Sequence, residues 1–189
     1  IKGTAPGPQG YYGSSGAPIA SQDACTIKLE PSGGIICMVG VTDQGQGVDT
    51  VMGQIAATVL GVSMDQIRVI SGDTDAAPYG GGTYASRATA IGGEAVYQAS
   101  QALRSEILEM AGILLQSEPE TLDIADGHVV DAESRENRIP LAEIGRIGHF
   151  QLGELPNDYQ PVLSATRRYR LTELPYIFTN GIHGAYLEV

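Results

Sequence analysis

The placement of glycine constrains this sequence more than any other feature. Glycine makes up 25 of the 189 residues, nearly twice the usual share of about 7%, and no G-X-Y repeat or low-complexity tract accounts for the excess. The richest clusters are Gly45-Gln46-Gly47 and Gly80-Gly81-Gly82. Each follows an expected strand and precedes an expected helix, where glycine permits positive φ angles and close approach of the backbone to a ligand.

Hydrophobic periodicity predicts the elements around these clusters. Residues 24–30 alternate in polarity, Pro31-Ser32-Gly33-Gly34 has turn chemistry, and residues 35–41 complete a hairpin. Helical spacing then begins, and either Asp49 or Thr50 is expected to cap its first turn. The expected elements that follow are a helix over 51–60 ended by Gly61, a strand over 67–70 and a longer helix over 91–116.

Smaller elements follow the second helix. Residues 121–124 and 128–130 are expected to form a strand pair, and residues 141–147 a short helix. Two further strands are expected over 162–171 and 182–189. The order β-β-α-β-α with additional strands predicts an α+β fold.

The chain is expected to divide into three parts. A Gly/Pro-rich opening segment covers 1–23, the main α+β domain covers 24–150, and a linker with returning strands covers 151–189. The sequence opens on Ile rather than Met, and its last strand has no terminating signal. We therefore expect a fragment of a longer chain, in which 151–189 belongs to an incomplete second part.

The charge balance excludes several classes of partner. The sequence has 22 acidic and 11 basic residues, a net charge of -11, so its surface repels nucleic-acid phosphates and anionic lipid. Neither a nucleic-acid nor a membrane partner is expected. The hydrophobic content of 42% is enough for a packed core. No apolar run approaches the roughly 20 residues of a membrane span, and a cytoplasmic protein is expected.

The cysteines and histidines do not predict a metal site. Cys25 and Cys37 are the two cysteines, and His128, His149 and His183 lie far apart in sequence, without the spacing of a zinc or iron–sulphur site. Both cysteines fall in apolar strands and are expected to be buried thiols. A disulfide across the hairpin is the alternative, if the register makes them direct partners.

The two glycine-rich turns are the candidate binding site. Backbone N–H groups at a helix start suit an anion or a polar heterocycle, to which Gln46 adds a carboxamide and Thr83 and Ser86 add hydroxyls. The alternative is that both turns are tight connections only. Neither turn carries a complete P-loop or dinucleotide-binding fingerprint.

Other polar residues are weaker candidates. Asp73 and Asp75 could bind a cation, but short acidic turns are usually capping devices. Glu94 complements the dipole of the second helix. Arg168 and Arg170 share one side of their expected strand, where arginines are usually solvated or paired.

These residues together resemble the molybdenum-cofactor subunit of the xanthine dehydrogenase family, which includes aldehyde oxidases, aerobic carbon monoxide dehydrogenases and bacterial N-heterocycle hydroxylases. The likeness is closest to the bacterial members. It is strong over 26–115 and looser over 163–189. The residues that carry it are Thr42 to Gly47, Thr50, Gln54, Leu60-Gly61, Ile67, Gly72-Asp73-Thr74, Pro78, Gly82 to Arg87, Gly93 and Ala95, with Phe178 to His183 in the looser part.

The resemblance implies that residues 24–150 form the cofactor-binding domain of a molybdenum-dependent oxidoreductase. Such enzymes hydroxylate an aldehyde or N-heterocycle, or oxidise CO, with water as the oxygen source. In the family a pterin dithiolene holds the metal, so no protein metal ligand is expected. The implied cofactor-binding residues are Gln44, Gly45, Gln46, Gly47, Gly82, Thr83, Tyr84, Ala85, Ser86, Arg87 and Ala88, with Arg87 as a phosphate partner. The mononucleotide and dinucleotide forms of the cofactor stay open.

The resemblance also implies components outside this sequence. The family's catalytic glutamate lies near the end of the subunit and has no match here, so neither Glu94 nor Glu188 is assigned as the base. Expected partners are the rest of the large subunit, iron–sulphur and FAD-binding domains or subunits, and a small-molecule substrate. The 189 residues alone are expected to be inactive. The alternative is a non-catalytic module that uses the two glycine loops to bind another anion or a protein.

Overall fold

A four-stranded sheet organises the computed structural model, which describes residues 2–4, 20, 22–171, 176–178 and 184–188. Its strands are β2 (Gln22–Leu29), β3 (Ile35–Val39), β4 (Ile67–Ile70) and β8 (Ser164–Arg170), in the order β4-β3-β2-β8. β3 and β4 run parallel, and the other neighbours are antiparallel. The predicted hairpin is therefore the centre of the sheet.

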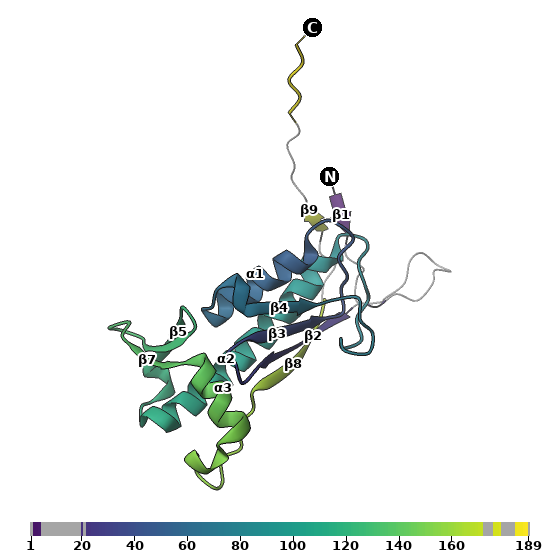
Figure 1. Ribbon diagram of the computed structural model, residues 1–189. Helices are drawn as coiled ribbons and strands as arrows, with labels where there is room; N and C mark the ends of the chain where they lie inside the picture. Colours follow the sequence, from purple (N-terminus) through teal and green to yellow (C-terminus); the bar gives the residue numbers. More distant parts are fainter. Residues whose placement is uncertain (1, 5–19, 21, 172–175, 179–183, 189) are drawn as a thin grey trace.

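Two long helices cover one face of this sheet (Figure 1). α1 (Val48–Leu60) is the crossover between the parallel strands β3 and β4. α2 (Gly93–Leu115) packs against α1, β2 and β8. A π-helical turn, η2 (Ala88–Gly92), runs directly into α2. The core lies between this helix pair and the inner face of the sheet.

The pleat of the hairpin explains which of its side chains reach the core. Cys25, Ile27 and Leu29 alternate along β2 and are buried on the helix side. Cys25 lies opposite Val39, whereas Cys37 lies opposite Ile27, so the two cysteines are diagonal neighbours. Their Sγ atoms are 3.7 Å apart and both are free thiols, and the disulfide alternative is not realised.

A smaller three-stranded sheet packs at the far end of the helices (Figure 1). It has the order β5-β6-β7. Gly61, which caps the end of α1 with φ 61°, lies close against this sheet. A Cβ on Gly61 would be only 2.0 Å from the carbonyl oxygen of Ile124. The elements of this part are η3 (Pro119–Thr121), β5 (Leu122–Ala125), β6 (His128–Asp131), β7 (Asn137–Pro140), α3 (Leu141–Phe150) and η4 (Leu152–Glu154).

Two short elements lie outside these sheets. β1 (Lys2–Thr4) pairs antiparallel with β9 (Tyr176–Phe178). A 3-10 turn, η1 (Met64–Gln66), precedes β4. None of the helices in the parts of the chain that the structure describes is long and apolar enough to cross a lipid bilayer.

The α+β class and the β-β-α-β-α order are confirmed. The strand expected over 182–189 is wrong for 184–188, which have no regular secondary structure, while 182, 183 and 189 lie outside the described residues. β1, β7 and β9 were not expected. The division at 23 and 150 stays a prediction, although β8 pairs along β2 and so joins residues of the second and third parts in one sheet.

Candidate functional site

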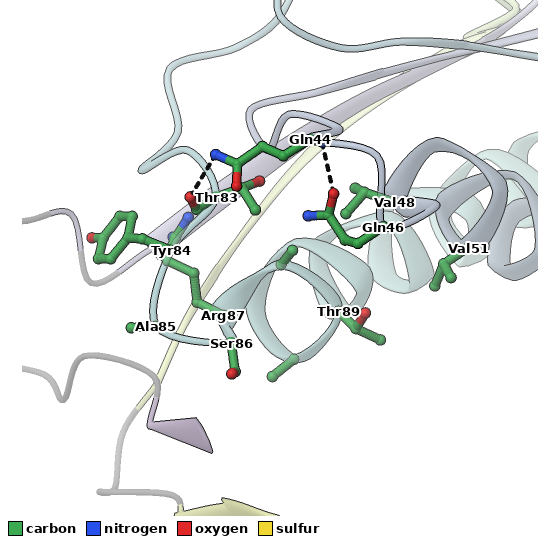
Figure 2. Close-up of a pocket in the computed structure, with 12 residues that line it drawn as sticks. Gln44, Gln46, Val48, Val51, Thr83, Tyr84, Ala85, Ser86, Arg87 and Thr89 are labelled. Carbon is green, nitrogen blue, oxygen red and sulfur yellow. Dashed lines mark hydrogen bonds between the residues drawn. The ribbon is translucent and has the colours of Figure 1, made fainter. Parts of the chain in front are cut away.

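The two glycine-rich loops meet through a reciprocal pair of hydrogen bonds. The Oγ1 of Thr83 accepts the backbone N–H of Thr42 at 2.9 Å and donates to the carbonyl oxygen of Thr42 at 2.6 Å. The Nε2 of Gln44 adds a bond of 3.2 Å to the carbonyl oxygen of Thr83. Figure 2 shows the two loops side by side above the start of the helices. Segments about 40 residues apart in sequence are thus fixed to each other.

A pocket of about 670 Å³ lies at this junction. Eight of the eleven predicted site residues line it, and Gly45, Gly47 and Gly82 belong to the same two loops without lining it. The predicted lining residues are Gln44, Gln46, Thr83, Tyr84, Ala85, Ser86, Arg87 and Ala88. Val48, Val51, Thr89 and Ala90 also line the pocket and were not predicted, although the apolar period of the first helix already contained Val51.

Asp43 accepts backbone N–H groups at and just before the start of α1, which does not support the expectation of an open anion site there. The carboxylate of Asp43 accepts the N–H of Gly45 at 2.6 Å and that of Asp49 at 3.2 Å. These bonds lower the pKa of Asp43 below its ordinary value. The residue at the N-cap is Gly47, with φ 82°, rather than Asp49 or Thr50. A carboxylate of the protein therefore already takes up donors that a bound anion would need.

Amide groups are the polar surface that the first loop offers instead. The Oε1 of Gln46 accepts the N–H of Gln44 at 2.7 Å, which fixes the carboxamide and leaves its NH₂ group without a partner among the described residues. A Cβ on Gly45, Gly47 or Gly82 would have no described atom within 4 Å. No side chain covers the backbone at these three glycines, so a flat polar ring can approach it closely.

The second loop has a strained backbone where it enters the helix. Ala85 and Ser86 both have positive φ, 50° and 57°, and two consecutive residues with side chains in this region cost free energy. The π-helical turn η2 follows after Arg87, and such turns occur frequently at functional sites. The hydroxyls of Ser86 and Thr89 are exposed and line the pocket.

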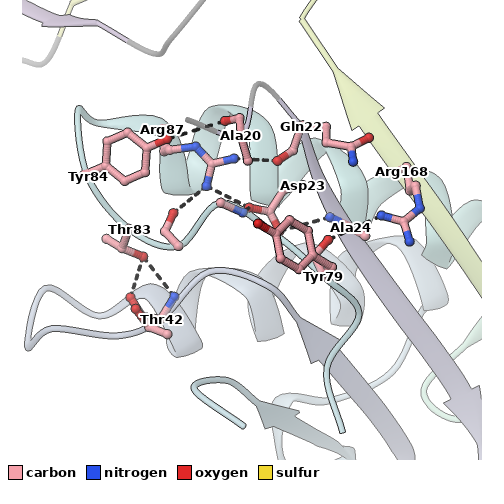
Figure 3. A network of polar contacts seen from close by, with 12 residues as sticks. Ala20, Gln22, Asp23, Ala24, Thr42, Tyr79, Thr83, Tyr84, Arg87 and Arg168 are labelled. Atoms are coloured by element: carbon pink, nitrogen blue, oxygen red, sulfur yellow. Dashed lines mark hydrogen bonds and ion pairs between the residues drawn. The ribbon is translucent and has the colours of Figure 1, made fainter. Parts of the chain in front are cut away.

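Arg87 is held inside the protein. Its Nη1 is 2.8 Å from the Oδ2 of Asp23, and both side chains are fully buried. The same nitrogen donates to the carbonyl oxygen of Gly82, and Nη2 donates to that of Gln22 at 2.8 Å. Figure 3 shows this network between β2 and the second loop. Because both terminal nitrogens serve acceptors of the protein, the contacts of Arg87 do not support its predicted role as a phosphate partner.

Asp23 is the residue of this network that sequence reasoning missed. It lies at the start of β2, 64 positions before Arg87, and no local pattern signals a partner so far away.

The weaker candidates have structural roles. The Oδ1 of Asp73 accepts the N–H groups of Asp75 and Ala76, so it caps its own turn. The carboxylate of Glu94 accepts the side-chain amide of Gln98 at 3.0 Å. Arg168 donates to the carbonyl oxygen of Tyr79 at 3.3 Å. Among the described residues, no three His, Cys, Asp or Glu side chains gather closely enough to hold a metal ion.

Two glycine-rich loops joined over one pocket, on an α+β scaffold, form the candidate binding site of this domain. The family model described as "Molybdopterin cofactor-binding domain" matches residues 2–189, and the chain belongs to this family. The predicted resemblance to the molybdenum-cofactor subunits of the xanthine dehydrogenase family is therefore confirmed, and the cofactor of such domains is the molybdenum–pterin cofactor.

Individual relatives agree with this assignment. The large subunit of nicotine 6-hydroxylase of Paenarthrobacter nicotinovorans is 31% identical over 180 residues, which are 95% of this chain and 22% of the relative. The molybdenum-binding subunit of xanthine dehydrogenase of Escherichia coli O157:H7 is 33% identical over 127 residues, 66% of this chain and 17% of the relative. The chain thus spans about a fifth of the length of these relatives.

The fold agrees with a solved structure as well. Quinoline 2-oxidoreductase of Pseudomonas putida 86 superposes with a TM-score of 0.78 at 30% identity, over 92% of this chain and 22% of the larger one. Domains of this family are parts of molybdenum-dependent oxidoreductases.

Proposed function

We propose that the pocket between the two loops binds the pterin of the molybdenum cofactor, and that the chain serves as the cofactor-binding part of a molybdenum hydroxylase large subunit. The observation that carries this proposal is the junction at Thr83. It fixes two glycine-rich loops around one pocket that eight of the eleven predicted residues line.

The residues at the pocket fit the chemistry of a pterin. A pterin ring is flat and carries both hydrogen-bond donors and acceptors, which suits the carboxamides of Gln44 and Gln46 and the hydroxyls of Ser86 and Thr89. Val48 supplies apolar contact for the ring. When bound, the cofactor supplies the redox chemistry of hydroxylation with water as oxygen source. The chain's own residues bind and orient it.

The activity and the partners of the whole protein follow from the same proposal. The substrate is a small molecule, an aldehyde, an N-heterocycle or CO. The proposed partners are the rest of the large subunit and iron–sulphur and FAD-binding domains or subunits, which would accept the electrons. The cytoplasmic location and the inactivity of the 189 residues alone stay predictions. Substrate turnover by the purified 189-residue chain would contradict the last of these.

The test is the cofactor content of the complete gene product, made in a host that synthesises the cofactor. Molybdenum is measured by mass spectrometry and pterin by the fluorescence of its oxidised form. Gln46→Ala is expected to lower the pterin retained per chain, because it removes the fixed carboxamide. Gln101→Ala is the matched control, since Gln101 is an exposed residue of α2 outside the pocket. A wild-type protein with neither molybdenum nor pterin would refute the proposal.

A non-catalytic anion-binding module, the alternative, has less support. Asp43 accepts the N–H of Gly45 in the first loop and that of Asp49 in the first turn of α1, and Arg87 is paired with Asp23. Two backbone donors of the first loop and α1, and both terminal nitrogens of Arg87, are therefore already bonded within the protein.

A further inference from the structure

Asp23 lines no part of the pocket, yet it holds the second loop from beneath. Its Oδ2 accepts the Nη1 of Arg87 at 2.8 Å and the backbone N–H of Gly81 at 3.2 Å. Its Oδ1 accepts the N–H of Ala24 at 2.9 Å. One fully buried carboxylate thus ties β2 to both ends of the segment 81–87.

Arg87 completes the connection. Its two terminal nitrogens donate to the carbonyl oxygens of Gln22 on β2 and Gly82 in the loop. The backbone N–H of Arg87 donates to the carbonyl oxygen of Tyr84 at 3.1 Å and closes a turn. The planar guanidinium of arginine presents donors in fixed directions and can make these contacts at once, whereas the compact ammonium of lysine cannot.

Three glycines leave the space in which this pair lies. A Cβ on Gly40 would be 2.5 Å from the Oδ1 of Asp23, and one on Gly80 would be 2.3 Å from the same atom. A Cβ on Gly81 would be 2.7 Å from the Cζ of Arg87. None of these glycines has the positive φ that would otherwise explain it, so close approach to the ion pair is the reason for glycine here.

The pair also opposes the strain in the loop. Ala85 and Ser86 hold left-handed conformations immediately before Arg87, and such a conformation persists only where the surroundings fix it. Thr83 anchors the loop before the strained pair, and Arg87 anchors it afterwards. Without the second anchor the backbone would relax, and the pocket wall would move with it.

We infer that Asp23 is a positioning residue, which acts through Arg87 to hold the segment Gly82–Ala88 in the conformation that receives the cofactor. Only the statement that this conformation receives the cofactor rests on the proposed function. It adds to the site a residue that neither lines the pocket nor belongs to either glycine loop.

The test separates positioning from plain stability with a double variant. Asp23→Asn with Arg87→Met removes both charges, because replacing a buried ion pair by uncharged groups often preserves stability, whereas removing one partner leaves an uncompensated charge. The matched control is Glu143→Gln with Arg146→Met, which removes an exposed pair on α3. Arg87→Lys is a second test, since it keeps the charge beside Asp23 but loses the fork.

Backbone hydrogen exchange of the complete, cofactor-free protein is the first measurement, and its pterin content after synthesis in a cofactor-making host is the second. We expect exchange of residues 82–88 to rise by about tenfold or more in the double variant and in Arg87→Lys, with β3 and α1 unchanged. The pterin per chain should fall, and the control should resemble wild type.

Three results would overturn the inference: unchanged exchange over 82–88, an equal rise across the whole domain, or full pterin content despite faster local exchange. If the double variant does not fold, Arg87→Lys decides among these results. A wild-type protein without pterin would instead refute the proposed function, and the exchange data would still decide whether Asp23 positions the loop.

Discussion

Replacing Thr83 by valine tests the junction between the two loops most directly. Valine keeps the shape and the β-branch of threonine but has no hydroxyl, so the change removes the two hydrogen bonds with the backbone of Thr42. Each such bond contributes about 1 kcal/mol net, and the N–H and C=O of Thr42, half-buried, lose their partners. The expected cost is about 2 kcal/mol, which raises the population of the open junction roughly 30-fold.

Hydrogen exchange at the amide of Thr42 measures this cost where it arises. That N–H is itself the donor to Thr83, so its exchange should become roughly 30-fold faster in Thr83→Val. Thr26→Val is the matched control, because its hydroxyl bonds that of Thr166 on an exposed face of the sheet, where water replaces the lost partner and the change stays within about 0.5 kcal/mol. Wild-type exchange at Thr42 in Thr83→Val would refute the reasoning.

Three further predictions concern single sites. Backbone N–H groups, that of Gly45 first, hold the pKa of Asp43 below its ordinary value of 3.8. Because the pKa is lower in the folded than in the unfolded protein, the ionised Asp43 stabilises the fold fully above the unfolded pKa. This stabilisation is lost as the pH falls through the folded pKa. Asp43→Asn should therefore flatten the fall in melting temperature below about pH 4, and an unchanged acid slope would count against it. The hydrogen bond with the neighbouring thiol and then burial raise the pKa of Cys25 well above 9.0, so iodoacetamide at pH 8 should label it only after urea unfolds the protein; labelling of the native protein would contradict this. Gly61→Ala should lower the melting temperature strongly, because its Cβ would lie 2.0 Å from a carbonyl oxygen of β5, whereas Gly153→Ala meets no described atom within 4 Å and should leave it unchanged.

The local elements were predictable because each has its own repeating pattern. The strand over 67–70 agrees with β4 to the residue, and the first long helix differs from α1 only at its start. That start was wrong because Asp43, six residues before Asp49, supplies the capping carboxylate. A cap that reaches back over a glycine turn depends on the loop conformation, which residue preferences do not determine.

The parts that the sequence did not predict depend on tertiary contacts. Nothing near Asp23 or Arg87 indicates that they pair, because 64 positions separate them in the sequence. β7 was not predicted because Asn137–Pro140 has little apolar alternation, and the strand forms by pairing with β6. The glycine clusters marked the loops that line the pocket, but only the structure distinguishes glycines with positive φ, such as Gly82, from glycines without it that make room, such as Gly80.

The pairing of β2 with β8 has a consequence for how the chain folds during synthesis. The bond between Thr26 and Thr166 spans 140 residues, and at 5–20 residues per second a ribosome needs on the order of 10 s to make them. Until β8 emerges, β2 is an open edge with unpaired backbone groups, a template for pairing with another chain. A product cut short before Ser164 would keep that edge, so aggregation of nascent or truncated chains should begin at β2.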